Sequence, residues 1–61
     1  MEIKITIFVQ PDGFITNAST ADGSFICTTS KPTLDESIAS AMKFIRDRAA
    51  KIQEKINEPA N

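Results

Sequence analysis

The sequence predicts an α+β fold in which a three-stranded antiparallel β-meander is followed by one long C-terminal α-helix, in the order β-β-β-α. Two observations lead to this prediction. The first half of the chain holds three short runs that alternate apolar and polar residues, separated by turn-forming residues. In the second half the apolar residues recur every three or four positions, which is the helical spacing. At 61 residues, the chain is expected to form a single small domain over residues 1–61.

The first strand is predicted over residues 2–10. Its β-branched residues occupy alternate positions and should form one buried face against the helix, which leaves Phe8 on the other face; they are Ile3, Ile5, Ile7 and Val9. Pro11-Asp12-Gly13 then supplies turn chemistry. We expect a three-residue hairpin loop that ends with Gly13 in the left-handed conformation.

Two weaker strands are predicted over residues 14–19 and 24–29, joined by a turn at 21–23. Phe25 and Cys27 are expected on one face of the third strand. Cys27 should behave as a small buried hydrophobe, because a free cysteine in a β-like run usually does so. Asp12 and Asp22 each precede a glycine, so turn formation accounts for both carboxylates.

The helix is predicted over residues 34–57. Thr33 and Glu36 form the pattern of a capping box at its start. The apolar residues follow at intervals of four and three, with no glycine or proline among them; they are Ile38, Met42, Ile45, Ala49, Ile52 and Ile56. This stripe should pack on the sheet.

A mismatch in length predicts a homodimer. A helix of 24 residues is about 36 Å long, whereas strands of six to nine residues are about 20–30 Å long. The far end of the stripe therefore projects beyond the sheet, and a second copy could cover it. The predicted dimer interface is Ile45, Ala49, Ile52 and Ile56. The alternatives are a monomer whose helix bends after Arg48 and a complex with a different protein.

A second set of residues forms the candidate surface for a partner protein: Phe8, Phe44, Arg48, Lys51 and Lys55. Phe44 lies off the main stripe beside basic residues, a combination typical of interface anchors. Each has a simpler alternative. Phe44 could widen the core-facing stripe, Phe8 could pack across the sheet on Phe14 or Phe25, and the basic residues could serve only to solvate the helix, as an Asp47–Lys51 pair would.

The composition excludes several classes of function. The chain has seven Lys and Arg against eight Asp and Glu, for a net charge of −1, and it has one cysteine and no histidine, tryptophan or tyrosine. We therefore expect no enzyme activity, no metal site and no cofactor. Nucleic acid is disfavoured as a partner because the chain lacks excess positive charge. No apolar run is long enough to span a membrane, and a lone cysteine favours the cytoplasm.

The order of these signals resembles the N-terminal part of HicB-type antitoxins. The matching segments are an alternating strand at Ile3 to Val9, the turn Asp12-Gly13-Phe14, and the helix start Thr33-Leu34-Asp35-Glu36-Ser37-Ile38. The chain departs from that family in lacking a proline-rich segment before the helix and a following strand and DNA-binding domain. The resemblance implies a toxin-neutralising surface without regulation of an operator.

Together these features predict a small non-enzymatic homodimeric protein-binding module, an inhibitor that masks the surface of a partner protein, as an antitoxin-like or phage-encoded counter-defence protein does. One alternative is a nucleic-acid-associated transcriptional regulator whose dimer sets the half-site spacing. Another is a structural assembly subunit.

Overall fold

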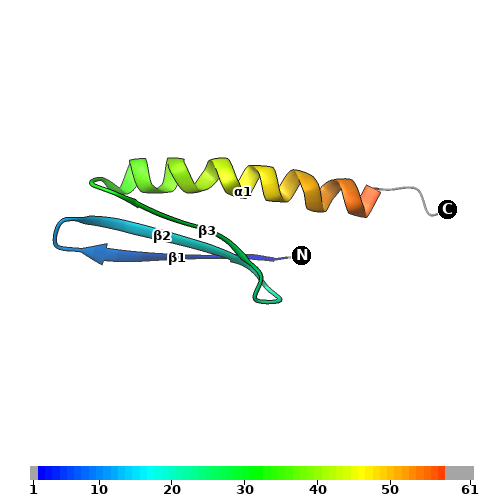
Figure 1. The fold of residues 1–61 in the computed structure, drawn as a ribbon, viewed down its shortest axis with the longest axis horizontal. Coiled ribbons are helices and arrows are strands. Elements are labelled where there is room, and N and C mark those ends of the chain that lie inside the picture. Colours follow the sequence, from blue (N-terminus) through cyan, green and yellow to red (C-terminus); the bar gives the residue numbers. More distant parts are fainter. Residues whose placement is uncertain (1, 58–61) are drawn as a thin grey trace.

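The computed structural model describes residues 2–57. They form β1 (Ile3–Gln10), β2 (Gly13–Thr20), β3 (Phe25–Lys31) and α1 (Leu34–Asn57). The strands make one antiparallel sheet in the order β1-β2-β3, and α1 lies along one of its faces (Figure 1). The predicted β-β-β-α order is confirmed. The predicted bounds agree to within two residues at every end.

The β1–β2 turn differs from the predicted loop. Gln10 pairs with Gly13, so the loop holds two residues, and the one positive-φ glycine in the described part of the chain is Gly23. The prediction of a left-handed Gly13 is therefore wrong. A different constraint applies at this position, because a Cβ on Gly13 would lie 2.7 Å from the carbonyl oxygen of Lys31. Glycine is needed here so that the end of β3 can approach the hairpin.

A β-bulge changes the faces of β3. Cys27 pairs with Ala18 and Phe25 pairs with Ser19, so Ile26 is the extra residue between them. A bulge breaks the regular alternation of side chains. As a result Cys27 is buried while Phe25 is 61% exposed, and the expectation that they share one face is not met.

The start of α1 has the Thr33 half of the predicted capping box. The Glu36 amide donates to Oγ1 of Thr33 at 3.2 Å, and the Ser37 amide donates to the Thr33 carbonyl at 3.1 Å. The first bond gives a partner to one of the backbone donors that the start of a helix leaves unsatisfied, and the second is the first regular hydrogen bond of the helix. Thr33 is therefore the N-cap of α1.

The core is small and partly polar. Its buried apolar residues are Ala18, Cys27, Ala41 and Ile45, and the buried polar residues are Thr16, Thr20 and Ser37. The line of α1 that meets the sheet is thus Ser37, Ala41 and Ile45. The predicted stripe shares only Ile45 with this line. Small side chains on both surfaces let the helix lie close to the sheet, which moves the larger isoleucines to one side.

Hydroxyl groups satisfy one another at the helix–sheet contact. Thr16 Oγ1 and Ser37 Oγ share a hydrogen bond of 2.8 Å, and Thr29 Oγ1 donates to the Ser37 carbonyl at 2.8 Å. In the described residues no buried side-chain nitrogen or oxygen lacks a partner. This network holds α1 to both β2 and β3 at a place where an unpaired hydroxyl would be costly.

The helix covers only part of the sheet. It contacts β2 and β3 but not β1 (Figure 1). The register places the apolar residues of β1 on the helix side, because Ile5 lies opposite Ala18 and Ile7 lies opposite Thr16. Ile5 is nevertheless 50% exposed and Val9 74% exposed. The predicted burial of this face against the helix is therefore wrong, since α1 lies too far from β1 to cover it.

The apolar flank of α1 faces the side of the uncovered strand β1. At 100° per residue, four apolar residues lie on the flank opposite Phe44 and Lys51; they are Ile38, Met42, Ala49 and Ile56. The helix runs in the same direction as β2, from Ser37 beside Thr16 toward Ile52 beside Thr20. Because the helix is right-handed, this apolar flank lies on the side of β1.

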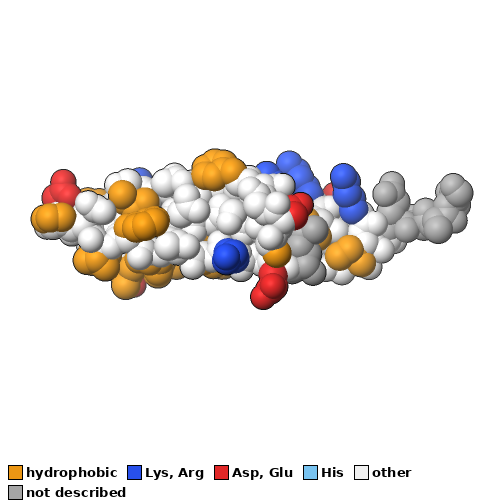
Figure 2. Space-filling model, turned by 90° about the horizontal axis from the view of Figure 1, so that it is seen from below, with side chains coloured by type: hydrophobic (Ala, Val, Ile, Leu, Met, Phe, Trp, Pro, Cys, Tyr) orange, Lys and Arg blue, Asp and Glu red, His pale blue; other side chains and the backbone are white. Residues whose placement is uncertain are grey.

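The molecule is elongated. Its radius of gyration is 13.6 Å, against about 10.5 Å expected for a compact chain of this length. Figure 2, which looks onto the β1 side, shows hydrophobic side chains gathered over the half of the molecule that holds the β1–β2 hairpin. Among the described residues, no helix has the length and apolar character to cross a membrane.

Candidate functional site

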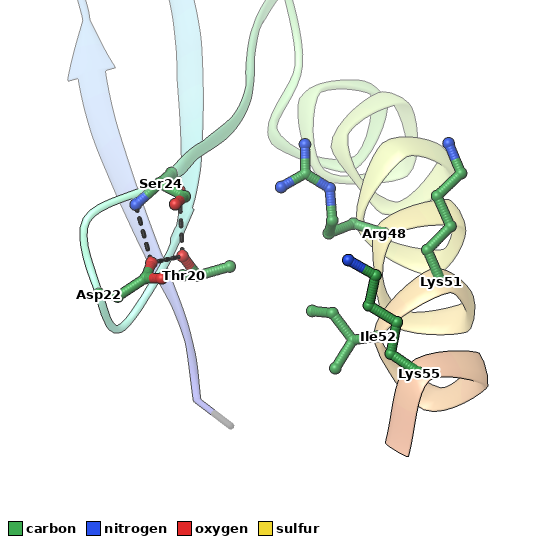
Figure 3. Close-up of a pocket in the computed structure, with 7 residues that line it drawn as sticks. All are labelled: Thr20, Asp22, Ser24, Arg48, Lys51, Ile52 and Lys55. Atoms are coloured by element: carbon green, nitrogen blue, oxygen red, sulfur yellow. Dashed lines mark hydrogen bonds between the residues drawn. The ribbon is translucent and has the colours of Figure 1, made fainter. Parts of the chain in front are cut away.

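A hollow lies between the second half of α1 and the β2–β3 turn. Its volume is about 370 Å³. We call it the basic notch; it is lined by Thr20, Asp22, Ser24, Arg48, Lys51, Ile52 and Lys55. The helix supplies Arg48, Lys51 and Lys55, and the turn on the opposite wall supplies the carboxylate of Asp22. Figure 3 shows Arg48 and Lys55 directed toward the turn and Lys51 directed away from it. An anionic group is the ligand that this charge balance favours.

The turn wall of the notch is held by a local network. Oδ1 of Asp22 accepts hydrogen bonds from Oγ1 of Thr20 and from the amide of Ser24, the latter at 3.0 Å. Gly23 takes a φ of +94°, and its amide donates to the Thr20 carbonyl at 3.0 Å. Glycine adopts this conformation without steric cost. The turn therefore presents a defined wall to the helix.

The carboxylate of Asp22 is engaged within the turn. The hydrogen bond from Thr20, followed by that from the Ser24 amide, holds the pKa of Asp22 below its ordinary value of 3.8. Hydrogen bonds of this kind favour the charged form. The predicted role of Asp22 in turn formation is confirmed by these contacts.

The helix wall keeps most of its charge available. Within residues 2–57 the one ion pair joins Lys51 Nζ to Asp47 Oδ2 at 3.4 Å, and both side chains are well exposed. This is the expected i,i+4 pair, and an exposed pair of this type contributes little stability. Arg48 and Lys55 have no acidic partner in the described part of the chain. They can therefore meet an outside anion without first breaking an ion pair there.

Four of the five predicted partner-binding residues lie together. Phe44, Arg48, Lys51 and Lys55 fall within about 60° on one flank of α1, at 100° per residue. Phe44 is 55% exposed, so it does not widen the buried line of the helix. An exposed aromatic ring beside basic side chains is a surface suited to protein binding.

Phe8 lies elsewhere. It is on the face of the sheet away from α1, opposite Ile15, and is 49% exposed. Phe14 is on the helix side, so the alternative in which Phe8 packs across the sheet on Phe14 is wrong. Phe8 therefore belongs to a different surface from the basic notch.

The predicted dimer residues have different environments in the single chain. Ile45 is buried in the core, and Ile52 is half-buried against the notch. Ala49 is exposed, and Ile56 is 64% exposed. Of the four, Ala49 and Ile56 leave most surface for another molecule.

Cys27 and the acidic residues show no arrangement typical of reactive sites. Cys27 is buried, its thiol donates to the Ala41 carbonyl at 3.8 Å, and burial raises its pKa. No group of three or more potential metal ligands occurs among residues 2–57. The buried position predicted for Cys27 is confirmed.

Two features could not be predicted from local patterns. The wall that Thr20, Asp22 and Ser24 form opposite the helix lies far from Arg48 along the chain, so it gives no local signal. The apolar face of β1 was predicted to lie in the core, whereas it is largely exposed. The small residues Ser37 and Ala41, one helical turn apart, were the sequence feature that indicated a close approach of α1 to only two strands.

Comparisons of the chain with protein-family models, with curated proteins and with solved structures find no match. What these surfaces can do follows from their own residues.

Proposed function

We propose that this chain is a small non-enzymatic homodimeric protein-binding module that masks an acidic surface of a partner protein. The observation that carries the proposal is the flank of α1 with Phe44, Arg48, Lys51 and Lys55, placed beside the notch. Phe44 supplies apolar contact area, and the cations supply complementarity to acidic side chains. Blocking a surface requires no catalytic group. In this proposal the chain therefore acts as an inhibitor by covering the surface of its partner.

The resemblance to HicB-type antitoxins also supports masking of a partner protein. If the chain acts as those antitoxins do, the masked protein is a toxin. A counter-defence protein would mask its target in the same manner. The cytoplasm is the proposed compartment, because a free cysteine is usual in reducing compartments.

A binding experiment with two probes tests this proposal. One probe is a fluorescent peptide of alternating glutamate and leucine, and the other is a fluorescent DNA duplex. We expect saturable binding of the peptide and a loss of at least tenfold in affinity for Arg48→Glu and Lys55→Glu. Phe44→Ala should also weaken binding.

Arg46→Glu is the matched control, because it makes the same charge change on an exposed residue of α1 outside the flank. An equal loss with Arg46→Glu means that net charge alone matters, and this contradicts the proposal. Tight, strongly salt-dependent binding of the DNA duplex with none of the peptide favours the alternative of a nucleic-acid regulator.

A further inference from the structure

The uncovered face of β1 leaves a row of apolar side chains open in the single chain. Ile5, Ile7 and Val9 are 50%, 41% and 74% exposed, and all three lie on the helix side of the sheet. Half-buried Ile3 precedes them on the same strand and packs against the core. A continuous apolar row of this kind marks an interaction surface.

The free edge of the same strand offers hydrogen bonds in phase with this row. The Ala21 amide donates to the Glu2 carbonyl, so the even-numbered residues of β1 form the hydrogen-bonded pairs with β2. In an antiparallel ladder the intervening residues direct their N–H and C=O groups to the other side. The backbone groups of Ile5 and Ile7 therefore point out from the edge of the sheet.

This edge has fewer of the features that prevent pairing than the edge of β3 has. β1 runs for eight residues with no proline and no bulge. Lys4 is its one charged residue. By contrast, β3 has a bulge near one end and Lys31 at the other. Proline, bulges and inward charges are the means by which natural sheets protect an edge.

We propose that β1 is the homodimer interface, pairing antiparallel with β1 of a second copy to form one continuous sheet of six strands, three from each copy. A strand with this alternation is its own complement about a twofold axis. With Thr6 opposite the partner's Thr6, Ile5 lies beside the partner's Ile7 on the apolar face. Lys4 then lies beside the partner's Phe8, so like charges are not opposed.

The size of this contact is sufficient for a specific dimer. An eight-residue strand is about 27 Å long, and a strip of that length with both rows of side chains covers roughly 500 Å² on each copy. The total of about 1,000 Å² reaches the lower bound of a specific interface. The apolar flanks of the two helices then border the joined β1 strands from both sides.

This inference rests on the homodimer in the proposed function, and it places the interface on β1 instead of on the helix end predicted from the sequence. The first test is the solution mass by light scattering, from low micromolar to near-millimolar concentration. We expect a dimer for the wild type, a monomer for Ile7→Lys, and a dimer for the control Ile56→Lys. Both isoleucines are well exposed in the single chain, so neither substitution opens the core; circular dichroism checks this.

The second test measures amide hydrogen exchange by NMR. The amides of Ile5 and Ile7 should become at least tenfold more protected as the dimer forms, while those of Thr28 and Ser30, on the free edge of β3, should not change. A synthetic chain N-methylated at Ile5 removes one edge donor without altering a side chain, and it should be monomeric. The same modification at Ser30 is its control.

The outcomes separate the two proposals. A dimer that Ile56→Lys dissociates and Ile7→Lys does not overturns the β1 interface but keeps the homodimer. A wild type that is monomeric throughout overturns the β1 interface and the homodimer together. The peptide-binding variants of the α1 flank are measured separately and decide the masking function in either case.

Discussion

At the scale of single residues, small polar side chains fill the helix–sheet contact, a position that larger apolar side chains occupy in most cores. Among residues 2–57, the fully buried side chains of greatest volume are Thr16 and Ser37. Their shared hydrogen bond satisfies both hydroxyls and lets the helix approach the sheet closely. The consequence is a core with little apolar area, which leaves the protein dependent on other contacts.

Asp22 gives a pH-dependent prediction at this scale. Because its folded pKa lies below 3.8, its charge stabilises the fold fully above that ordinary value, and this stabilisation is lost as the pH falls through the lowered folded pKa. Asp22→Asn should therefore lower the melting temperature at neutral pH. The difference from wild type should shrink below pH 3.8 and then vanish.

Thermal unfolding followed by circular dichroism over a pH series measures this effect. Asp12→Asn, which also precedes a turn glycine, is the control and should change the melting temperature less. A constant difference between wild type and Asp22→Asn at all pH values would show that the carboxylate charge has no part in the stability of the turn.

At the scale of elements, each strand and the helix are defined largely by local chemistry. The helix begins at its capping residue, and the turns occur at Pro11-Asp12 and around Gly23. The β-bulge is the exception, because it depends on how β3 pairs with β2. Local signals therefore predicted where elements begin and end better than which face each residue occupies.

The N-cap of α1 provides a prediction at this scale. Thr33→Ala removes the acceptor of the Glu36 amide and should lower the free energy of unfolding by about 1 kcal/mol. Thr33→Ser keeps a hydroxyl at the same position and should lie within a few tenths of a kcal/mol of wild type. Urea denaturation measures both. An equal loss for the two variants would argue that the methyl group of Thr33, and not the cap, is responsible.

At the scale of the whole molecule, α1 is longer than the strands of the sheet, but it is narrower than the three strands side by side. The excess length leaves Ile56 exposed, and the limited width leaves β1 uncovered. The predicted dimer at the helix end follows from the length mismatch alone. The uncovered strand presents a longer apolar row, together with free backbone donors and acceptors.

Stability should depend on protein concentration if the dimer forms through β1. A partner that binds only the folded chain stabilises it by mass action. The melting temperature of the wild type should rise as protein concentration increases, and that of Ile7→Lys should not. Differential scanning calorimetry over the same concentration series measures this. A melting temperature independent of concentration in the wild type would contradict a dimer that dissociates on unfolding.

Local sequence features were enough to predict the element order, the helix N-cap, the turn around Gly23, the buried Cys27 and the grouping of Phe44, Arg48, Lys51 and Lys55 on one flank. These features depend on residues within a few positions of one another, where spacing and local hydrogen bonding act directly. The packing of the helix on the sheet sets which line of α1 is buried, which faces the β-bulge produces, and that Thr20, Asp22 and Ser24 lie opposite the basic flank. It also decided that β1 is uncovered. Those outcomes depend on how closely the small side chains of α1, β2 and β3 pack. The spacing of apolar residues in the sequence does not give that helix–sheet distance.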